Sequence, residues 1–188
     1  MRNEAVRVVP VSGALSAAET ELLVTASTDE TLLDATYLPS DLDERGAVAW
    51  ASSEAGRGWF MYLEGNPVGF YGVGPLRSSC GLDIPSAAVE REVWLTPAAR
   101  GQGVVRAATE LLRERLLERG VEYIVSVIAA SNSAAIAGVK NGGFKQLGHG
   151  WWEHAEYGRY WCEVWILNLR DSGLDASLAG SGDSSAQG

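Results

Sequence analysis

The segment from Val89 to Arg119 constrains the fold more than any other part of the chain. It begins with a short apolar run, Val89–Thr96, which is typical of a β-strand and stops at Pro97, because proline cannot donate to a strand ladder. Two glycines follow, and Val104–Arg119 then repeats apolar residues at helical spacing. Its leucines are expected to share one side of this helix: Leu111, Leu112, Leu116 and Leu117. A strand, a turn and an amphipathic helix in this order favour an α/β fold.

Shorter patterns on either side complete the expected sheet. Ser16 lies three residues ahead of Glu19, a capping box that predicts the start of a helix after a first strand at 6–11. A hairpin over 58–74 is predicted to turn at Gly65-Asn66-Pro67, and 28–47 is expected to be loop or short helix. Further along we expect a buried strand at 122–130, a short helix at 133–140 and a hairpin of strands 144–153 and 159–169. This order predicts one mixed α/β sheet.

Length and composition limit the classes of protein to which the chain can belong. A length of 188 residues and a hydrophobic fraction of 46% fit one folded domain, which we place at 1–170. Residues 171–188 are rich in Ser, Gly, Ala and Asp and are predicted to be a disordered tail. No apolar run is long enough to cross a bilayer and no signal peptide is recognisable, so we expect a cytoplasmic protein without a membrane partner.

Charge and cysteine content exclude further classes. The net charge of −9 argues against a nucleic-acid partner, because phosphates are held by clustered Lys and Arg. The two cysteines, Cys80 and Cys162, are too few for a disulfide framework and have no metal-ligand spacing, so no metal is expected. We expect them to be small buried apolar residues.

Gly101 and Gly103 stand where the long helix must begin, although glycine is a poor helix former. The first N–H groups of a helix have no partner within it and carry partial positive charge, so they can bind a phosphate. Two residues without side chains would let a ligand reach these donors, and Arg100 could add charge. The same glycines could instead simply make a tight turn between the strand and the helix.

Two motifs together resemble the GNAT superfamily of acyl-CoA-dependent N-acyltransferases. The phosphate motif of that family, R/Q-x-x-G-x-G/A, is similar to the run from Arg100 to Val105, which follows Leu95-Thr96-Pro97. Downstream, the family's Asn, its Ala three residues later and its Gly-Phe pair match Asn132, Ala135 and Gly143-Phe144. The resemblance covers roughly residues 6 to 169 and implies a mixed, mostly antiparallel central sheet with flanking helices.

The resemblance also implies the residues that would bind acetyl-CoA as cosubstrate. The backbone of Val93, Trp94 and Leu95 would hold the pantetheine arm in a splay beside the strand at 122–130, and Asn132 would contact the cofactor beyond it. The phosphates would lie on the following run: Arg100, Gly101, Gln102, Gly103, Val104 and Val105. Val105 replaces the usual Gly or Ala but still supplies its backbone N–H. Val139 stands where the family often has a Tyr that protonates the departing thiolate.

Two carboxylates are candidates for the general base. Strand alternation puts Glu90, Glu92 and Trp94 on one face and Arg91, Val93 and Leu95 on the other. A carboxylate near the thioester could accept the proton of an attacking amine, directly or through water. The alternative is that Glu90 and Glu92 are solvated or pair with Arg91 or other cations, and a bulge could reverse the faces.

The last hairpin carries an aromatic cluster that could cage a cationic substrate but that we expect to be core: Trp151, Trp152, Tyr157, Tyr160, Trp161 and Trp165. His154 is a reserve candidate for proton transfer, although a surface position is favoured.

The sequence therefore predicts an N-acetyltransferase that acts on a primary amine of a small molecule or a protein N-terminus by direct attack in a ternary complex. The competing hypothesis, motivated by Val139, is a non-catalytic acyl-CoA-binding module. The acceptor is not specified, and a homodimer is left open.

Overall fold

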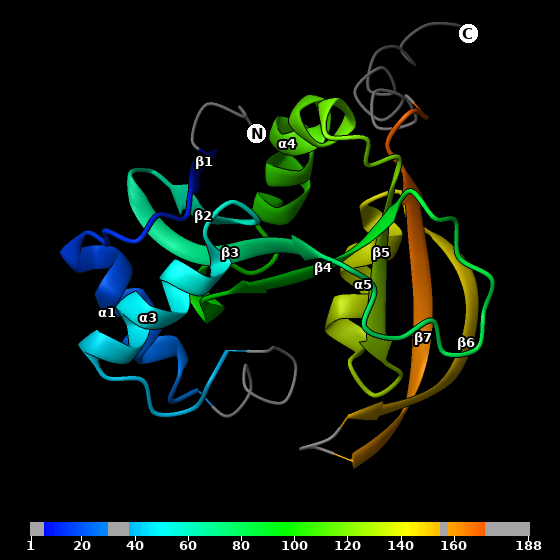
Figure 1. The fold of residues 1–188 in the computed structure, drawn as a ribbon, viewed down its shortest axis with the longest axis horizontal. Helices are drawn as coiled ribbons and strands as arrows, with labels where there is room; N and C mark the ends of the chain where they lie inside the picture. Colours follow the sequence, from blue (N-terminus) through cyan, green and yellow to red (C-terminus); the bar gives the residue numbers. More distant parts are fainter. Residues whose placement is uncertain (1–5, 30–37, 155–157, 172–188) are drawn as a thin grey trace, which may run out of the picture.

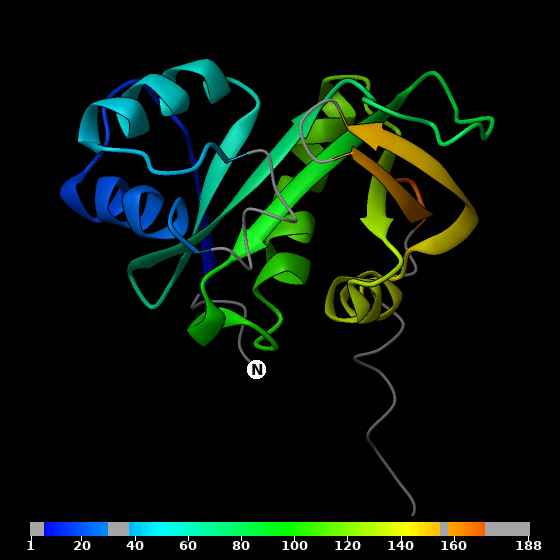
Figure 2. The ribbon, with the colours of Figure 1, turned by 90° about the horizontal axis from the view of Figure 1, so that it is seen from below.

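The computed structural model describes residues 6–29, 38–154 and 158–171. One seven-stranded sheet runs through the molecule and is flanked by helices on both faces (Figure 1, Figure 2). The strands are β1 (Val6–Pro10), β2 (Gly58–Leu63), β3 (Asn66–Gly74), β4 (Ala88–Leu95), β5 (Tyr123–Ala129), β6 (Lys145–His154) and β7 (Gly158–Asn168). The described helices are α1 (Ala17–Ala26), α3 (Glu44–Glu54), α4 (Val104–Glu118) and α5 (Ser133–Asn141), with a 3-10 turn at Pro97–Ala99.

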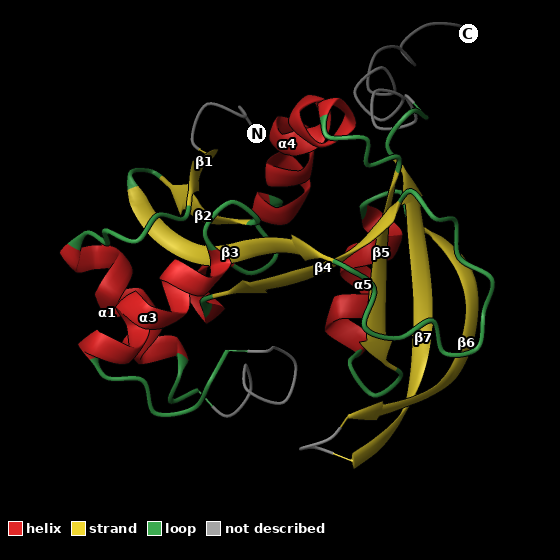
Figure 3. Cartoon of the chain, viewed as in Figure 1, coloured by secondary structure: helices red, strands yellow, loops and turns green. Residues whose placement is uncertain are grey.

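The strand order is β1-β2-β3-β4-β5-β7-β6 (Figure 3). Every neighbouring pair is antiparallel except β4 and β5, which are parallel and joined by α4. A parallel pair needs such a crossover, whereas the antiparallel pairs can be closed by short turns. The predicted mixed, mostly antiparallel sheet with flanking helices is confirmed.

Alternation along β2 and β3 divides the interior into two cores. Phe60 and Phe70 pack with α1 and α3 on one face, while Met61 and Tyr71 pack with α4 and α5 on the other. All four side chains are completely buried. Because successive strand residues point to opposite faces, each of these strands contributes to both cores and ties the helices of the two faces together.

Most predicted boundaries agree with the structure to within one or two residues. The capping box is present: Ser16 Oγ accepts from the backbone N–H of Glu19, and Ser16 N donates to Glu19 Oε2 at 2.8 Å. The predicted hairpin turn was misplaced, however. The turn residues are Glu64 and Gly65, with φ of 51° and 88°, while Asn66 and Pro67 already belong to β3.

Two further expectations about helices need correction. The sequence did not predict α3 as a full helix, yet Asp43 caps it by accepting from Gly46 N at 2.7 Å, and Ala47 and Ala51 are fully buried one turn apart. In α4, Leu112 and Leu116 are buried, but Leu111 is 51% exposed. At 100° per residue the side chain of Leu111 turns away from the face that α4 presents to the sheet. Part of 28–47, and the tail from residue 172 onward, lie outside the described residues.

Candidate functional site

The central parallel pair of strands is bonded over only part of its length. Pairing between β4 and β5 covers Ala88, Val89 and Glu90, which lie opposite 123–125. Beyond Glu90, β4 continues to pair with β3 as far as Leu95, and β5 continues to pair with β7 as far as Ala129. The two strands therefore diverge from residue 91 onward (Figure 3). This divergence gives the splay that was expected beside 122–130, with a β4 edge that an extended polar ligand can pair with.

The N-terminus of α4 lies just past the end of β4 and is open. Gly103 is the N-cap with φ of 76°, Gly101 has φ of 74°, and a Cβ added to either residue would meet no atom within 4 Å. The first bond of the helix runs from Ala107 N to Gly103 O, so the N–H groups of residues 104–106 precede the ladder. A phosphate group can reach these backbone donors without meeting a side chain, so this turn fits the pyrophosphate of an acyl-CoA.

The other predicted donor-site residues occupy defined places around this opening. Val93 and Leu95 pack against the core under α4 and α5, and Val104 is buried there. Trp94 is only 3% exposed and stacks on Phe70 in the opposite core, so only its backbone lies at the opened edge.

Polar side chains near the turn are partly engaged with the chain itself. Gln102 Nε2 donates to Ala98 O at 2.7 Å, and Arg100 Nε donates to Leu95 O at 3.3 Å. Asn132 is the N-cap of α5, where its Oδ1 accepts from Ala135 N at 3.0 Å. The spacing of Asn132 and Ala135 in the sequence is therefore also what helix capping requires.

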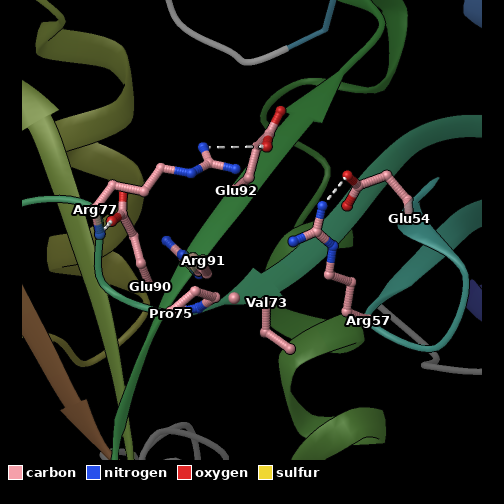
Figure 4. Close-up of a pocket in the computed structure, with 9 residues that line it drawn as sticks. Glu54, Arg57, Val73, Pro75, Arg77, Glu90, Arg91 and Glu92 are labelled. Carbon is pink, nitrogen blue, oxygen red and sulfur yellow. Dashed lines mark hydrogen bonds and ion pairs between the residues drawn. The ribbon is translucent and has the colours of Figure 1, made fainter. Parts of the chain in front are cut away.

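Glu90 and Glu92 line one pocket on the face of β4 that points toward α3 (Figure 4). Glu90 Oε2 accepts from the backbone N–H of Arg77 at 2.8 Å, and Glu92 Oε2 lies 3.8 Å from Arg77 Nη1. Across the pocket, Arg57 forms an ion pair with Glu54 at 2.5 Å. The two carboxylates thus share a site with cations from both neighbouring connections, but Arg91, which the sequence offered as their partner, does not pair with them.

Arg91 points to the other face of β4. Its Nε donates to Ser126 Oγ on β5 at 2.8 Å, and its guanidinium lies 4.3 Å from the centre of the Phe144 ring. Burial lowers the pKa of this guanidinium, and the hydroxyl of Tyr71 acts in the opposite direction. The side chain consequently spans the two strands where they begin to separate.

Val139 is 1% exposed and packs in the core beneath α5. Its hydrocarbon side chain has no proton to donate, so the absence of a Tyr at this position is not offset by Val139 itself.

The aromatic cluster is divided between core and surface. Trp165 is buried as expected, but Trp151 and Trp161 are 50% and 42% exposed, which corrects their assignment to the core. The rings of this exposed pair pack edge to face with their centres 5.1 Å apart, and the Arg159 guanidinium carbon lies 4.4 Å from the centre of the Trp151 ring. They are exposed because the hairpin extends past Ala129, where β5 ends. The ring centres of Trp152 and Tyr160 are 6.3 Å apart. Tyr157 lies outside the described residues.

Among the described residues, no cluster of three or more His, Cys, Asp or Glu could hold a metal ion. Cys162 is buried and Cys80 partly buried, and both are free thiols. No helix in the described ranges is long and apolar enough to span a membrane.

An opened parallel strand pair beside an uncapped, glycine-flanked helix N-terminus fits an acyl-CoA-dependent acyltransferase. Comparison with protein families agrees, because residues 24–144 match the model of the acetyltransferase (GNAT) family. The chain belongs to this family and is an acetyl-CoA-dependent acyltransferase.

Solved structures of low sequence identity share the fold. One is yncA from Salmonella typhimurium with its cofactor acetyl-CoA, at 22% identity and a TM-score of 0.62, covering 92% of this chain and 99% of that one. Another is a ribosomal-protein-alanine N-acetyltransferase from Brucella melitensis, at 22% identity and a TM-score of 0.63, covering 86% and 99%. A third is the microcin C7 self-immunity acetyltransferase MccE in complex with acetyl-CoA and AMP, at 13% identity and 0.70, covering 88% and 93%. A comparison with curated proteins finds no match.

Proposed function

We propose that the protein transfers the acetyl group of acetyl-CoA to a primary amine, of a small molecule or a protein N-terminus, by direct attack in a ternary complex. The observation that carries the proposal is the arrangement of functional groups on the two sides of strand β4. Its opened edge and the uncapped turn of α4 lie on the donor side, and the carboxylates of Glu90 and Glu92 lie on the opposite face. One strand would thus separate the donor from the acceptor and hold both within reach.

The donor site uses backbone groups for binding. The main chain of 93–95 would pair with the amides of the pantetheine arm, and the first turn of α4 would bind the pyrophosphate. Arg100, Gln102 and Asn132 would contact the cosubstrate at its polar end. Bound there, acetyl-CoA supplies an activated acyl group, and the chain has to supply orientation and a proton acceptor.

We assign the proton acceptor to Glu92. An amine must be neutral to attack, so a carboxylate has to take its proton directly or through a water. One oxygen of Glu90 is engaged by the backbone N–H of Arg77 at 2.8 Å, which gives Glu90 a role in holding the connection 75–87. Glu92 has the longer contact, 3.8 Å to a side chain, and its own side chain is 12% exposed. The carboxylate of Glu92 is therefore largely shielded from water, and its ion pair is to a side chain, whereas Glu90 accepts from the backbone.

No acid is required at Val139, because a thiol with a pKa of about 8.5 is a good leaving group even as a thiolate. A missing Tyr would therefore slow the reaction without preventing it.

Matched Gln variants test the assignment. Glu92→Gln is expected to lower turnover by about 10²–10⁴-fold at neutral pH, with partial recovery as the pH rises and more amine becomes neutral. Acetyl-CoA affinity should stay unchanged. Glu90→Gln is the control, because the Gln carbonyl can still accept from Arg77 N, and a smaller loss is expected.

The kinetics separate the alternatives. If the loss appears in the KM of the amine with turnover preserved, the carboxylate binds a cationic acceptor instead of accepting its proton. If a broad panel of amines releases no free thiol although acetyl-CoA binds, the protein is the non-catalytic module.

A further inference from the structure

The guanidinium of Arg91 lies where β4 and β5 begin to separate. Glu90 and Val125 form the last pair between β4 and β5, and Arg91 and Ser126 are the residues that follow them. The 2.8 Å bond from Arg91 Nε to Ser126 Oγ crosses the gap there. From Leu95, next to the turn of α4, back to Arg91 is four residues, or about 13 Å at the rise of a strand. An extended arm anchored at α4 and lying along β4 therefore ends at Arg91.

No carboxylate neutralises this guanidinium within the part of the chain that the structure describes. Its contacts are Ser126 Oγ, the Phe144 ring and the hydroxyl of Tyr71. Glu90 and Glu92 point to the opposite face of the strand. Arg91 is partly buried, and a charge withdrawn from water is ordinarily paired, because desolvation penalises it. An uncompensated cation at this place favours a ligand on which negative charge is present or develops.

We infer that Arg91 is a catalytic residue that stabilises the negative charge developing on the thioester during acetyl transfer. The inference rests on the proposed function and assigns to Arg91 the part of the reaction that Val139 cannot perform. Arg91 belongs to the lining of the pocket that holds Glu92, but its guanidinium reaches Ser126 on the other face of β4. The proton acceptor and the guanidinium would therefore act from opposite faces of the same strand.

The step balances without any further reactant. The amine nitrogen bonds to the thioester carbon, and its proton passes to Glu92. The carbon–sulfur bond breaks, and its electron pair stays on sulfur, beside the guanidinium of Arg91. Solvent protonates the thiolate after release. Arg91 keeps its own proton throughout, as a guanidinium does in proteins.

Binding of CoA and desulfo-CoA tests the inference without any acceptor, because these ligands differ only in the sulfur. An opposite charge within contact lowers a pKa by at least about one unit, so at pH 9 CoA should bind about tenfold more tightly than desulfo-CoA. At pH 6 the two should bind equally. Other titratable groups on the surrounding elements are Tyr71, Lys140, Glu163 and the two carboxylates across β4. Their effect on the thiolate is the same in the wild type and in an Arg91 variant, so it cancels when the two proteins are compared.

Variants locate the effect. Arg91→Met should remove the preference for CoA at pH 9 and lower turnover by about 10²–10³-fold. Arg91→Lys keeps the charge and should retain much of the preference, which guards against loss of folding in the Met variant. Arg113 on α4 is the control, since its Nε donates to Leu169 O at 2.7 Å, one residue past the end of β7. Arg113→Met should leave the ligand preference unchanged.

Two results would overturn the inference. One is a CoA preference that persists in Arg91→Met. The other combines three observations. The wild-type protein would bind CoA and desulfo-CoA alike at pH 9, it would bind succinyl-CoA at least tenfold more tightly than acetyl-CoA, and Arg91→Met would lose that preference for succinyl-CoA. That result would make Arg91 a receptor for an acyl carboxylate. Failure of the proposed function is distinguishable, because it would leave amines unacetylated while the ligand comparison still depended on Arg91.

Discussion

Two requirements favour glycine at position 103, one from the backbone conformation and one from the ligand. Its φ of 76° is in the left-handed region, and the space that a Cβ would take is empty. A side chain there costs about 1–2 kcal/mol in backbone strain and extends into the place where phosphate would lie. A substitution must therefore be compared with one that has the same strain but no ligand beside it.

Gly120, at the other end of the same helix, offers that comparison, with φ of 79° and no atom within 4 Å of an added Cβ. Gly103→Glu is expected to weaken acetyl-CoA binding by about tenfold or more, since it sets a carboxylate against the phosphates. Gly120→Glu should lose similar stability and keep its affinity. Calorimetry with thermal melts measures both, and equal affinities in the two variants would remove the phosphate site from α4.

The two thiols differ in reactivity for reasons of burial. Desolvation raises the pKa of Cys162 to about 11, and the pKa of the partly buried Cys80 is raised as well. Only the thiolate is alkylated, so at pH 8 roughly one Cys162 in 10³ is reactive. We expect mass spectrometry to show slow alkylation of Cys80 first, and of Cys162 only on unfolding or as the pH approaches 11. Rapid double labelling of native protein at pH 8 would contradict this.

The connection 75–87 shows how one element positions another. It runs from β3 to the outer face of β6 before returning to β4 (Figure 1). There Leu82 lies over Gly148 and Cys80 over Gly150, and the absence of side chains at these two glycines leaves room for the connection. The same connection carries Arg77, which contacts Glu90 and Glu92. The last hairpin thus indirectly supports the pocket at β4.

Paired alanine variants test this support. In Gly150→Ala the new Cβ would meet the carbonyl oxygen of Cys80, which belongs to the backbone, whereas in Gly148→Ala it would meet the flexible end of Leu82. We expect Gly150→Ala to cost about 1–3 kcal/mol of unfolding free energy and Gly148→Ala less. Hydrogen exchange at Arg77 N–H, which donates to Glu90, should speed up only in Gly150→Ala. Equal urea midpoints for the two variants would show that the connection does not rest on β6.

At the scale of the whole molecule, the domain is predicted to end at Arg170. Leu169 is 1% exposed, its N–H donates to Glu122 O at 2.9 Å, and its carbonyl accepts from Arg113. Deleting 171–188 removes little apolar surface and should leave the melting temperature and activity unchanged. Deleting 169–188 removes a core residue and should lower the melting temperature by about 5 °C or more. A comparable drop from the shorter deletion would show that the tail packs on the domain.

The sequence by itself determined the local elements and the motifs. The capping box at Ser16 and Glu19, the end of β4 before Pro97 and the glycines ahead of α4 depend on interactions between residues a few positions apart, and such interactions can be recognised in a linear pattern. The strand parity that put Glu90 and Glu92 on one face was also correct, because β4 pairs with β3 without a register shift from residue 90 to residue 95.

Tertiary structure decided what depends on residues far apart in the chain. Strand order, the divergence of β4 from β5, the turn of Arg91 toward Ser126 and the exposure of Trp151 all follow from how separate segments pack. The alternation that separates Arg91 from the carboxylates was visible in the sequence, but its partner on β5 is 35 positions away. Local propensity carries no information about such a contact, because its free energy comes from burial and hydrogen bonding that exist only once the sheet has formed.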